Sequence, residues 1–525
     1  MKMNFSRVMR ALALRHKDRE AIVNVERQRR YSYWDYHLLT NRIANALRET
    51  LKVGVGDKFL LILENDNLSL MMGPTVLKQE GTVVLTNLRD SVEEHRWQVE
   101  LVKPRVVFLE NRLLDGYYEW LRTLGCEIVV MDPLIDLREG VHVFWDLVAA
   151  VPDADTGVEL DTLEHTFMLR FTGGTTGRGK CAMYSIDNVL ACRDGTLANP
   201  ALNFDERTRL LHVAPLSHGS QIFYYTTIFV GGANVTLNQL DLEGWREVVE
   251  QEAISHSFLV PTILYRLLEL QRAKPRDLSS LCTIIYGAAP MSPSKLGELI
   301  GCFGSIFAQA YAATEVITPI AVLDKGEHRC DEPQAIQRLA SAGRIMPGVE
   351  VCVVDENGRE LAAGKVGEIR IRSRGVIQGY YLNPEGTASE FVGGAWKSGD
   401  LGYFDDDGYL YIVDRIKDMI ITGGFNVYAV EVEAALSSHP AVLQSAVVGV
   451  PHPEWGEAVH AEVVLRAGGQ ASDQELITHV KERIGGHKAP KAVSFVDSLP
   501  TSVVGKVLRR QVKEKYWQGA QRKVS

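Results

Sequence analysis

Short, continuously apolar runs, separated by amphipathic helical segments, limit this chain to a narrow range of folds. Such runs occupy residues 58–63, 83–85, 106–109, 127–131, 210–214 and 283–286. Strands that are apolar on both faces are typical of sheets covered by helices on both sides. The first 350 residues are therefore predicted to form layered α/β units.

The pattern changes after about residue 350. A turn signal at residues 355–358 and a hairpin at residues 403–413 indicate a small antiparallel β unit. The last hundred residues predict a separate α+β module, with strands at 443–450, 459–465 and 493–496 and a helix at 473–484.

Length and composition exclude several classes of protein. The chain has 525 residues, of which 46% are hydrophobic and 23% charged, so it is long enough for two to four globular units and is not disordered. Its net charge of −9 lacks the basic field of a non-specific nucleic-acid binder, so no nucleic-acid partner is expected. No apolar run reaches 18 residues, so no transmembrane segment is expected either.

Cysteine usage and the N-terminus predict a cytoplasmic protein. The seven cysteines are odd in number and lack metal-ligand spacing, which favours reduced thiols. Phe5, Val8, Met9 and Leu12 share one helical face, and arginines interrupt any apolar signal region. We therefore expect an ordinary first helix, with a basic amphipathic transit peptide as the alternative.

Residues 171–180, Phe-Thr-Gly-Gly-Thr-Thr-Gly-Arg-Gly-Lys, form the stretch richest in glycine and hydroxyl groups. Small residues let backbone N–H groups approach an anion, and the lysine adds charge. Gly174, Gly179 and Lys180 match part of the kinase P-loop pattern, but Cys181 stands where Ser or Thr would hold Mg²⁺. A triphosphate loop of another kind is favoured over a P-loop kinase or ATPase, and a turn without ligand is the remaining alternative.

This loop resembles the signature of the acyl-adenylate-forming superfamily, which includes acyl- and aryl-CoA synthetases, luciferases and peptide-synthetase adenylation domains. Gly179 and Cys181 replace the proline and glycine usual in that signature. Further segments extend the resemblance in family order, at 286–290, 309–315, 396–415, 414–426 and 499–506.

The resemblance implies an ATP site and assigns its residues. It assigns ATP binding to Thr172, Gly173, Gly174, Thr175, Thr176, Gly177, Lys180, Gly287, Ala288, Ala289, Tyr311, Asp400, Ile412 and Arg415. An aromatic face suits adenine, and a carboxylate can accept hydrogen bonds from both ribose hydroxyls. Catalysis is assigned to Lys506, Thr314 and Glu315, with Glu315 also as the Mg²⁺ ligand. Read without the resemblance, Thr314 and Glu315 could equally begin a helix, and Lys506 would be surface.

The resemblance also implies a moving domain. Lys506 would aid adenylate formation and obstruct the thioester step, so the C-terminal module is expected to rotate about a hinge at Lys417. Gly423 and Gly424 correspond to a loop that lines the CoA tunnel. The implied architecture is α/β: a body at residues 1–416, with two α/β subdomains and a small β-barrel-like subdomain, and a small mobile α+β lid at residues 417–525.

The acyl pocket is assigned to His218, Tyr286 and Gly287. No aspartate follows closely to pair with an amino-acid ammonium, so an apolar acid (fatty, aryl or alicyclic) is expected. The expected activity is an AMP-forming carboxylic acid:CoA ligase that uses ATP, Mg²⁺ and coenzyme A, with a homodimer as one option. The alternatives are an enzyme that loads a carrier protein or another acceptor, and a silent scaffold, because Ala312 and Ala429 also depart from the family pattern.

Overall fold

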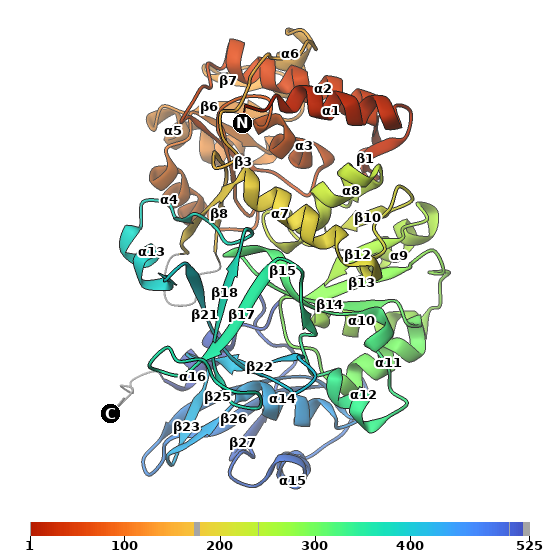
Figure 1. Ribbon diagram of the computed structural model, residues 1–525, viewed down its shortest axis with the longest axis vertical. Helices are drawn as coiled ribbons and strands as arrows, with labels where there is room; N and C mark the ends of the chain where they lie inside the picture. The colour runs from red at the N-terminus through yellow and green to blue at the C-terminus, as the bar shows by residue number, and fades with distance from the viewer. Residues whose placement is uncertain (1, 173–178, 240, 503–504, 518–525) are drawn as a thin grey trace.

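The computed structural model describes residues 2–172, 179–239, 241–502 and 505–517. The chain forms a large N-terminal body followed by a small C-terminal domain (Figure 1), as predicted. The described cysteines, which are all seven, are free thiols. Among the described residues, no helix combines the length and apolar character that crossing a membrane requires.

The first α/β unit is built on an eight-stranded sheet. Its strands, in spatial order, are β19 (Gly379–Tyr380), β9 (Cys181–Ser185), β8 (Thr166–Phe171), β4 (Thr82–Leu85), β3 (Lys58–Ile62), β5 (Val106–Leu109), β6 (Glu127–Val130) and β7 (Val141–Val143). From β8 to β7 the strands are parallel, whereas β9 and β19 are antiparallel additions.

Helices cover both faces of this sheet, which explains why its strands are apolar throughout. They are α2 (Tyr33–Asn45), α3 (Asn67–Val76) and α6 (Phe144–Ala149) on one face and α4 (Val92–Val102) and α5 (Leu114–Thr123) on the other. In β3, Phe59 packs toward the first face and Leu60 toward the second, and both side chains are fully buried.

The second α/β unit is built on a nine-stranded sheet. Its strands, in spatial order, are β16 (Arg344–Ile345), β15 (Val316–Leu323), β14 (Phe307–Ala313), β13 (Thr283–Gly287), β12 (His256–Leu259), β10 (Arg209–His212), β11 (Ala233–Thr236), β1 (Glu20–Asn24) and β2 (Arg29–Ser32). The helices of this unit and its connections are α1 (Phe5–His16), α7 (Ile186–Leu197), α8 (Tyr224–Val230), α9 (Leu242–Gln251), α10 (Pro261–Ala273), α11 (Pro293–Phe303) and α12 (Pro333–Arg338). Helix α1 confirms the predicted first helix, with Phe5 and Met9 buried.

A small antiparallel β unit follows. It contains β17 (Val349–Val354), β18 (Gly367–Ser373), β20 (Phe391–Val392), β21 (Ala395–Phe404) and β22 (Leu410–Arg415), with α13 (Pro384–Glu390) beside them. The predicted hairpin is confirmed, because β21 and β22 pair with Phe404 opposite Leu410.

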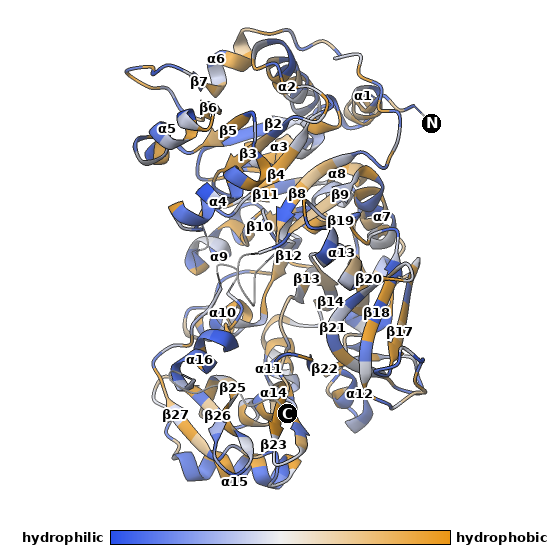
Figure 2. Cartoon of the chain, turned by 90° about the vertical axis from the view of Figure 1, so that its left-hand side faces the viewer, coloured by the Kyte–Doolittle hydropathy of each residue, from blue (hydrophilic) through white to orange (hydrophobic). Residues whose placement is uncertain are grey.

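The C-terminal domain has a five-stranded sheet with helices on both faces. Its elements are β23 (Ile420–Thr422), β24 (Phe425–Val427), β25 (Val442–His452), β26 (Gly456–Leu465), β27 (Ala492–Phe495), α14 (Ala429–Ser437), α15 (Asp473–Ile484) and α16 (Arg509–Tyr516). The predicted helix at 473–484 is confirmed, and Ser472 and Glu475 form a capping box at its start. In Figure 2, hydrophobic residues gather in the strands, whereas α16 is largely hydrophilic.

Several ion pairs and hydrogen bonds join the C-terminal domain to the body. Arg466 forms ion pairs with Glu269 on α10 and Glu298 on α11. The Ser294 hydroxyl donates to the Ser437 carbonyl oxygen at 3.3 Å, and the Thr262 hydroxyl donates to the Gly505 carbonyl oxygen at 2.7 Å. The last contact holds the segment that carries Lys506.

Candidate active site

Two of the predicted ATP-binding side chains, Tyr311 and Arg415, converge on the carboxylate of a third, Asp400. The Tyr311 hydroxyl, at β14, donates to Asp400 Oδ2 at 2.7 Å, and Arg415 Nε lies 3.2 Å from Asp400 Oδ1. Asp400 and Arg415 face each other because β21 and β22 pair in that register. Ile412, the fourth predicted residue of this group, is half-buried on β22 against the core of the small β unit.

Lys506 lies close to this group although it belongs to the other domain. Burial, together with the positive charges of Arg415 and Arg509, lowers the pKa of its ammonium to about 8, against the opposing effect of Asp400. Gly505 has a φ of +82°, and a Cβ there would lie 3.2 Å from Thr262 Oγ1. The backbone that presents Lys506 to the body therefore depends on glycine at position 505.

Thr314 and Glu315 lie in the turn between the antiparallel strands β14 and β15, so the alternative prediction of a helix start is wrong. The Thr314 carbonyl oxygen accepts a hydrogen bond from Tyr184, and Glu315 Oε1 accepts one from the Tyr380 hydroxyl at 3.0 Å. Burial raises the pKa of Glu315. This half-buried carboxylate could offer an oxygen ligand to a divalent cation, and such ions prefer oxygen ligands.

The described ends of the phosphate loop are hydrogen-bonded to each other. The amide of Thr172 donates to the Lys180 carbonyl oxygen at 2.8 Å, and the amide of Lys180 donates to Thr172 Oγ1 at 3.0 Å. Cys181 starts β9 with its side chain in the core, where burial raises the pKa of the thiol to about 12. The predicted residues Gly173, Gly174, Thr175, Thr176 and Gly177 lie outside the described residues.

Lys180 has two neighbours that the sequence reasoning missed. Its Nζ forms an ion pair with Glu390 and lies 4.6 Å from the ring centroid of Tyr380. Burial opposes ionisation of Glu390, but hydrogen bonds from Lys180 and Tyr380 lower its pKa overall. No local pattern in the sequence signals this pairing, because the two charged residues are 210 positions apart.

The turn after β13 is the predicted segment at Gly287, Ala288 and Ala289. A Cβ at Gly287 would lie 2.3 Å from the Ala310 carbonyl oxygen, so only glycine fits against β14. Ala288 has a φ of +63°, which is unusual for a residue other than glycine. Strained backbone of this kind persists where the surroundings enforce it and clusters at ligand sites.

Tyr286 and His218 are not brought together. Tyr286 is fully buried in the core formed with α9, α10 and α11, and its hydroxyl pairs with His328 Nε2 at 2.9 Å. Its neighbour Ile285 occupies the opposite face of the sheet, and the acyl-pocket role of Tyr286 stays a prediction. His218 lies 3.0 Å from Ser217 Oγ, and burial and Arg170 lower its pKa to about 4.

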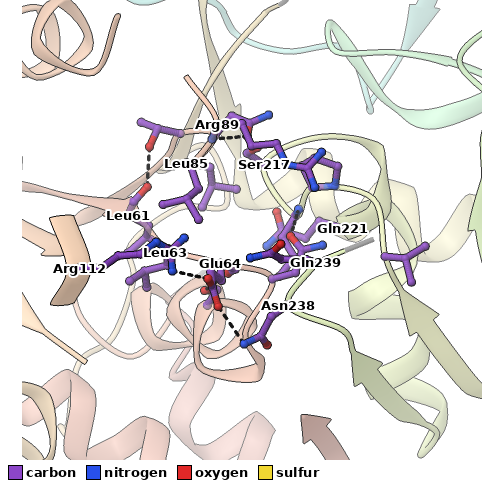
Figure 3. A pocket seen from close by; sticks show the side chains of 18 residues that line it. Leu61, Leu63, Glu64, Leu85, Arg89, Arg112, Ser217, Gln221, Asn238 and Gln239 are labelled. Atoms are coloured by element: carbon purple, nitrogen blue, oxygen red, sulfur yellow. Dashed lines mark hydrogen bonds and ion pairs between the residues drawn. The ribbon is translucent and has the colours of Figure 1, made fainter. Parts of the chain in front are cut away.

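A cavity of about 230 Å³ borders the segment that contains His218 (Figure 3). Pro215, Leu216 and Ser217 line it together with charged and amide side chains that include Glu64, Arg112, Asn87, Gln221 and Asn238. Glu64 accepts hydrogen bonds from Arg112 and Asn238, as the dashed lines in Figure 3 indicate. The sequence reasoning did not predict this polar cavity.

Gly423 and Gly424 form the turn between β23 and β24, with φ values of +55° and +82°. Both residues are exposed, and β23 lies at the end of the C-terminal domain away from the body in both views (Figures 1 and 2). In this orientation of the domain, the predicted CoA loop and Lys506 therefore do not share one site. Lys417 lies in the short connection between β22 and β23; desolvation and Arg415 lower its pKa.

A buried network flanks this connection. Asp414 accepts hydrogen bonds from the amides of Ala429 at 2.6 Å and Arg415 at 2.8 Å, and it pairs with Arg509. Ala429 stands where the resemblance predicts a proline, which would lack this N–H donor. Alanine in place of proline at position 429 therefore adds a backbone hydrogen bond to Asp414.

Comparison with known proteins identifies the family. Residues 9–381 match the AMP-binding enzyme family, and residues 431–506 match the AMP-binding enzyme C-terminal domain. The chain therefore belongs to the AMP-binding, adenylate-forming enzymes.

The names of individual relatives specify different acyl acceptors, either CoA or an acyl carrier protein. The medium/long-chain-fatty-acid–CoA ligase FadD8 of Mycobacterium tuberculosis is 37% identical over 432 residues, covering 81% of this chain and 74% of that protein. A feruloyl-CoA synthase of an Amycolatopsis species is 35% identical over 367 residues, covering 70% and 72%. The fatty acid–[acyl-carrier-protein] ligase ScoC of Streptomyces coeruleorubidus is 33% identical over 505 residues, covering 95% and 94%.

A solved relative is known in two states. ATP-bound MatB from Rhodopseudomonas palustris superposes with a TM-score of 0.87 at 27% identity, covering 98% of this chain and 99% of that chain. Apo MatB superposes with a TM-score of 0.77 at the same identity, covering 99% and 100%. The overall arrangement of this chain is thus more similar to the ATP-bound state.

Proposed function

We propose that this chain is an ATP-dependent carboxylic acid:CoA ligase that releases AMP and pyrophosphate. The observation that carries the proposal is the position of Lys506: it follows Gly505, whose carbonyl oxygen accepts a hydrogen bond from Thr262 of the body, and it is close enough to Arg415 and Asp400 for their charges to influence its pKa. Lys506 brings a positive charge from the C-terminal domain to the group formed by Asp400, Tyr311 and Arg415. Such a charge suits a reaction in which negative charge develops on phosphoryl oxygens.

The residues take the following roles. Asp400 accepts hydrogen bonds from the ribose hydroxyls, Tyr311 lies along adenine, and Lys180 binds the β- and γ-phosphates. A carboxylate oxygen of the substrate attacks the α-phosphorus, and the bond to pyrophosphate breaks while Lys506 neutralises the charge. Glu315 would hold Mg²⁺, which supplies further positive charge to the phosphates when bound.

In the second half-reaction the thiolate of CoA attacks the acyl carbonyl carbon and AMP leaves. Gly423 and Gly424 follow β23, which lies at the end of the C-terminal domain away from the body in Figures 1 and 2, so we expect this step to require rotation about the connection that contains Lys417. The module that presents Lys506 first would then present the glycine turn.

The acid is proposed to be apolar. Phe258, Phe223 and Ile285 form one apolar cluster, and a Cβ at Gly219, next to His218, would lie 3.2 Å from the Phe258 ring. Relatives named for fatty and feruloyl substrates support this class. The cavity beside Ser217 has a mixed lining, which includes the Glu64–Arg112 ion pair as well as Leu61, Leu63 and Leu85.

The test is release of pyrophosphate and AMP across a panel of fatty, aryl and alicyclic acids, with and without CoA. We expect acid-dependent pyrophosphate release and CoA-dependent turnover. Release of ADP, or no acid dependence with any acid, contradicts the proposal. A carrier protein is the second candidate acceptor, supported by ScoC, which matches 95% of the chain; exchanging CoA for a phosphopantetheinylated carrier protein distinguishes the two.

A further inference from the structure

Lys180, which is assigned above to binding of the triphosphate, already pairs with a carboxylate within the protein. Its Nζ forms an ion pair with Glu390 at the end of α13, and both side chains are about one-third exposed, at 35% and 32%. The same Nζ packs over the ring of Tyr380. An incoming phosphate group would therefore meet Glu390 as a competitor for the same ammonium.

Glu390 is also held in place from its other side. The Tyr380 hydroxyl donates to Glu390 Oε2 at 2.5 Å and lies 3.0 Å from Glu315 Oε1. Glu390 and Tyr380 thus link the lysine at the phosphate loop to the Glu315 carboxylate at the β14–β15 turn.

The backbone that carries Glu390 is anchored independently of Lys180. Asn383 caps α13 by accepting from the Gly386 amide at 2.8 Å, and Thr387 Oγ1 accepts from the Tyr380 amide at 2.9 Å. The ring of Phe391 packs on Tyr380 with centroids 5.7 Å apart. Because this backbone is fixed, the negative charge of Glu390 stays beside Lys180 when Lys180 turns to another anion.

We propose that Glu390 is an internal counter-ion that holds Lys180 in the nucleotide-free protein and competes with the triphosphate, thereby setting the affinity for ATP. The inference rests on the proposed function, because it takes Lys180 as a phosphate ligand. Two anions that share one partly exposed cation weaken each other's binding. The pyrophosphate product would face the same competition, so Glu390 also favours its release.

The test is a thermodynamic cycle on the full-length protein, measured as the Kd of α,β-methylene-ATP by calorimetry without acid or CoA. Glu390→Gln keeps the shape and removes the charge, and we expect it to tighten binding about 5- to 10-fold. Lys180→Met should weaken binding, and adding Glu390→Gln to it should change nothing further. Glu385→Gln, an exposed carboxylate on the same helix, is the matched control and should leave the Kd unchanged.

The outcomes separate the two proposals. No binding by the wild-type protein contradicts the proposed function. Binding by the wild type with an unchanged or weaker Kd in Glu390→Gln overturns the counter-ion role alone. If Glu390→Gln tightens nucleotide binding equally in the presence of Lys180 and in the Lys180→Met background, the counter-ion role is also overturned. The effect would then come from the general repulsion between Glu390 and the nucleotide and not from competition for Lys180.

Discussion

Arg466 is positioned to hold the C-terminal domain in the orientation that presents Lys506. Its Nη1 lies 2.9 Å from Glu269 Oε1 and its Nη2 lies 2.7 Å from Glu298 Oε1. Rotation of the domain would break both contacts. Arg466→Gln is therefore expected to shift the protein away from the adenylate-forming orientation.

The size of the shift follows from the exposure of the groups. The Arg466 side chain is 19% exposed, and the carboxylates of Glu269 and Glu298 are 45% and 29% exposed. Partly exposed ion pairs contribute about 0.2–1 kcal/mol each, so the two together contribute about 0.4–2 kcal/mol. That energy corresponds to a change of about 2- to 30-fold in the equilibrium between domain orientations.

The assay separates the half-reactions. Single-turnover pyrophosphate release measures adenylate formation, and thioester formation from a supplied acyl-adenylate and CoA measures the second step. We expect Arg466→Gln to slow the first step several-fold and to leave the second unchanged or faster. Arg483→Gln is the matched control, because Arg483 is exposed on α15 and bonds to His479 within its own domain. Equal slowing of both steps by Arg466→Gln would refute the reasoning.

Three further predictions concern the assigned residues. Lys506→Ala should suppress adenylate formation far more than thioester formation. With a pKa of about 8, only about a tenth of the Lys506 side chains carry a charge at pH 9, so kcat/KM for ATP should fall above pH 8. Lys506→Arg should remove that decline, because arginine stays charged over this range. Asp400→Asn should weaken ATP binding about 10-fold, as a loss of roughly 1.4 kcal/mol predicts, and calorimetry that finds an unchanged Kd would contradict the ribose assignment. Gly424→Val, at a φ of +82°, should impair thioester formation while pyrophosphate release stays normal; the same two half-reaction assays test this.

Local signals predicted the secondary structure well. The run at residues 106–109 became β5, and the helix at 473–484 became α15, because apolar runs and a capping box act within a few residues. The turn between β14 and β15 escaped this reasoning. Thr314 and Glu315 are common at helix starts, and only pairing of the flanking strands makes that segment a turn.

The sequence by itself determined the order of the elements, the division into an α/β body and an α+β module, and the chemical type of each assigned residue. The tertiary structure decided which side chains meet. Strand parity placed Tyr286 and Ile285 in two different buried clusters on opposite faces of the sheet, and the packing of α13 brought Glu390 to Lys180. The physical reason is that propensity, capping and apolar spacing act over a few residues, whereas pairing across two hundred residues depends on the register and packing of the whole fold.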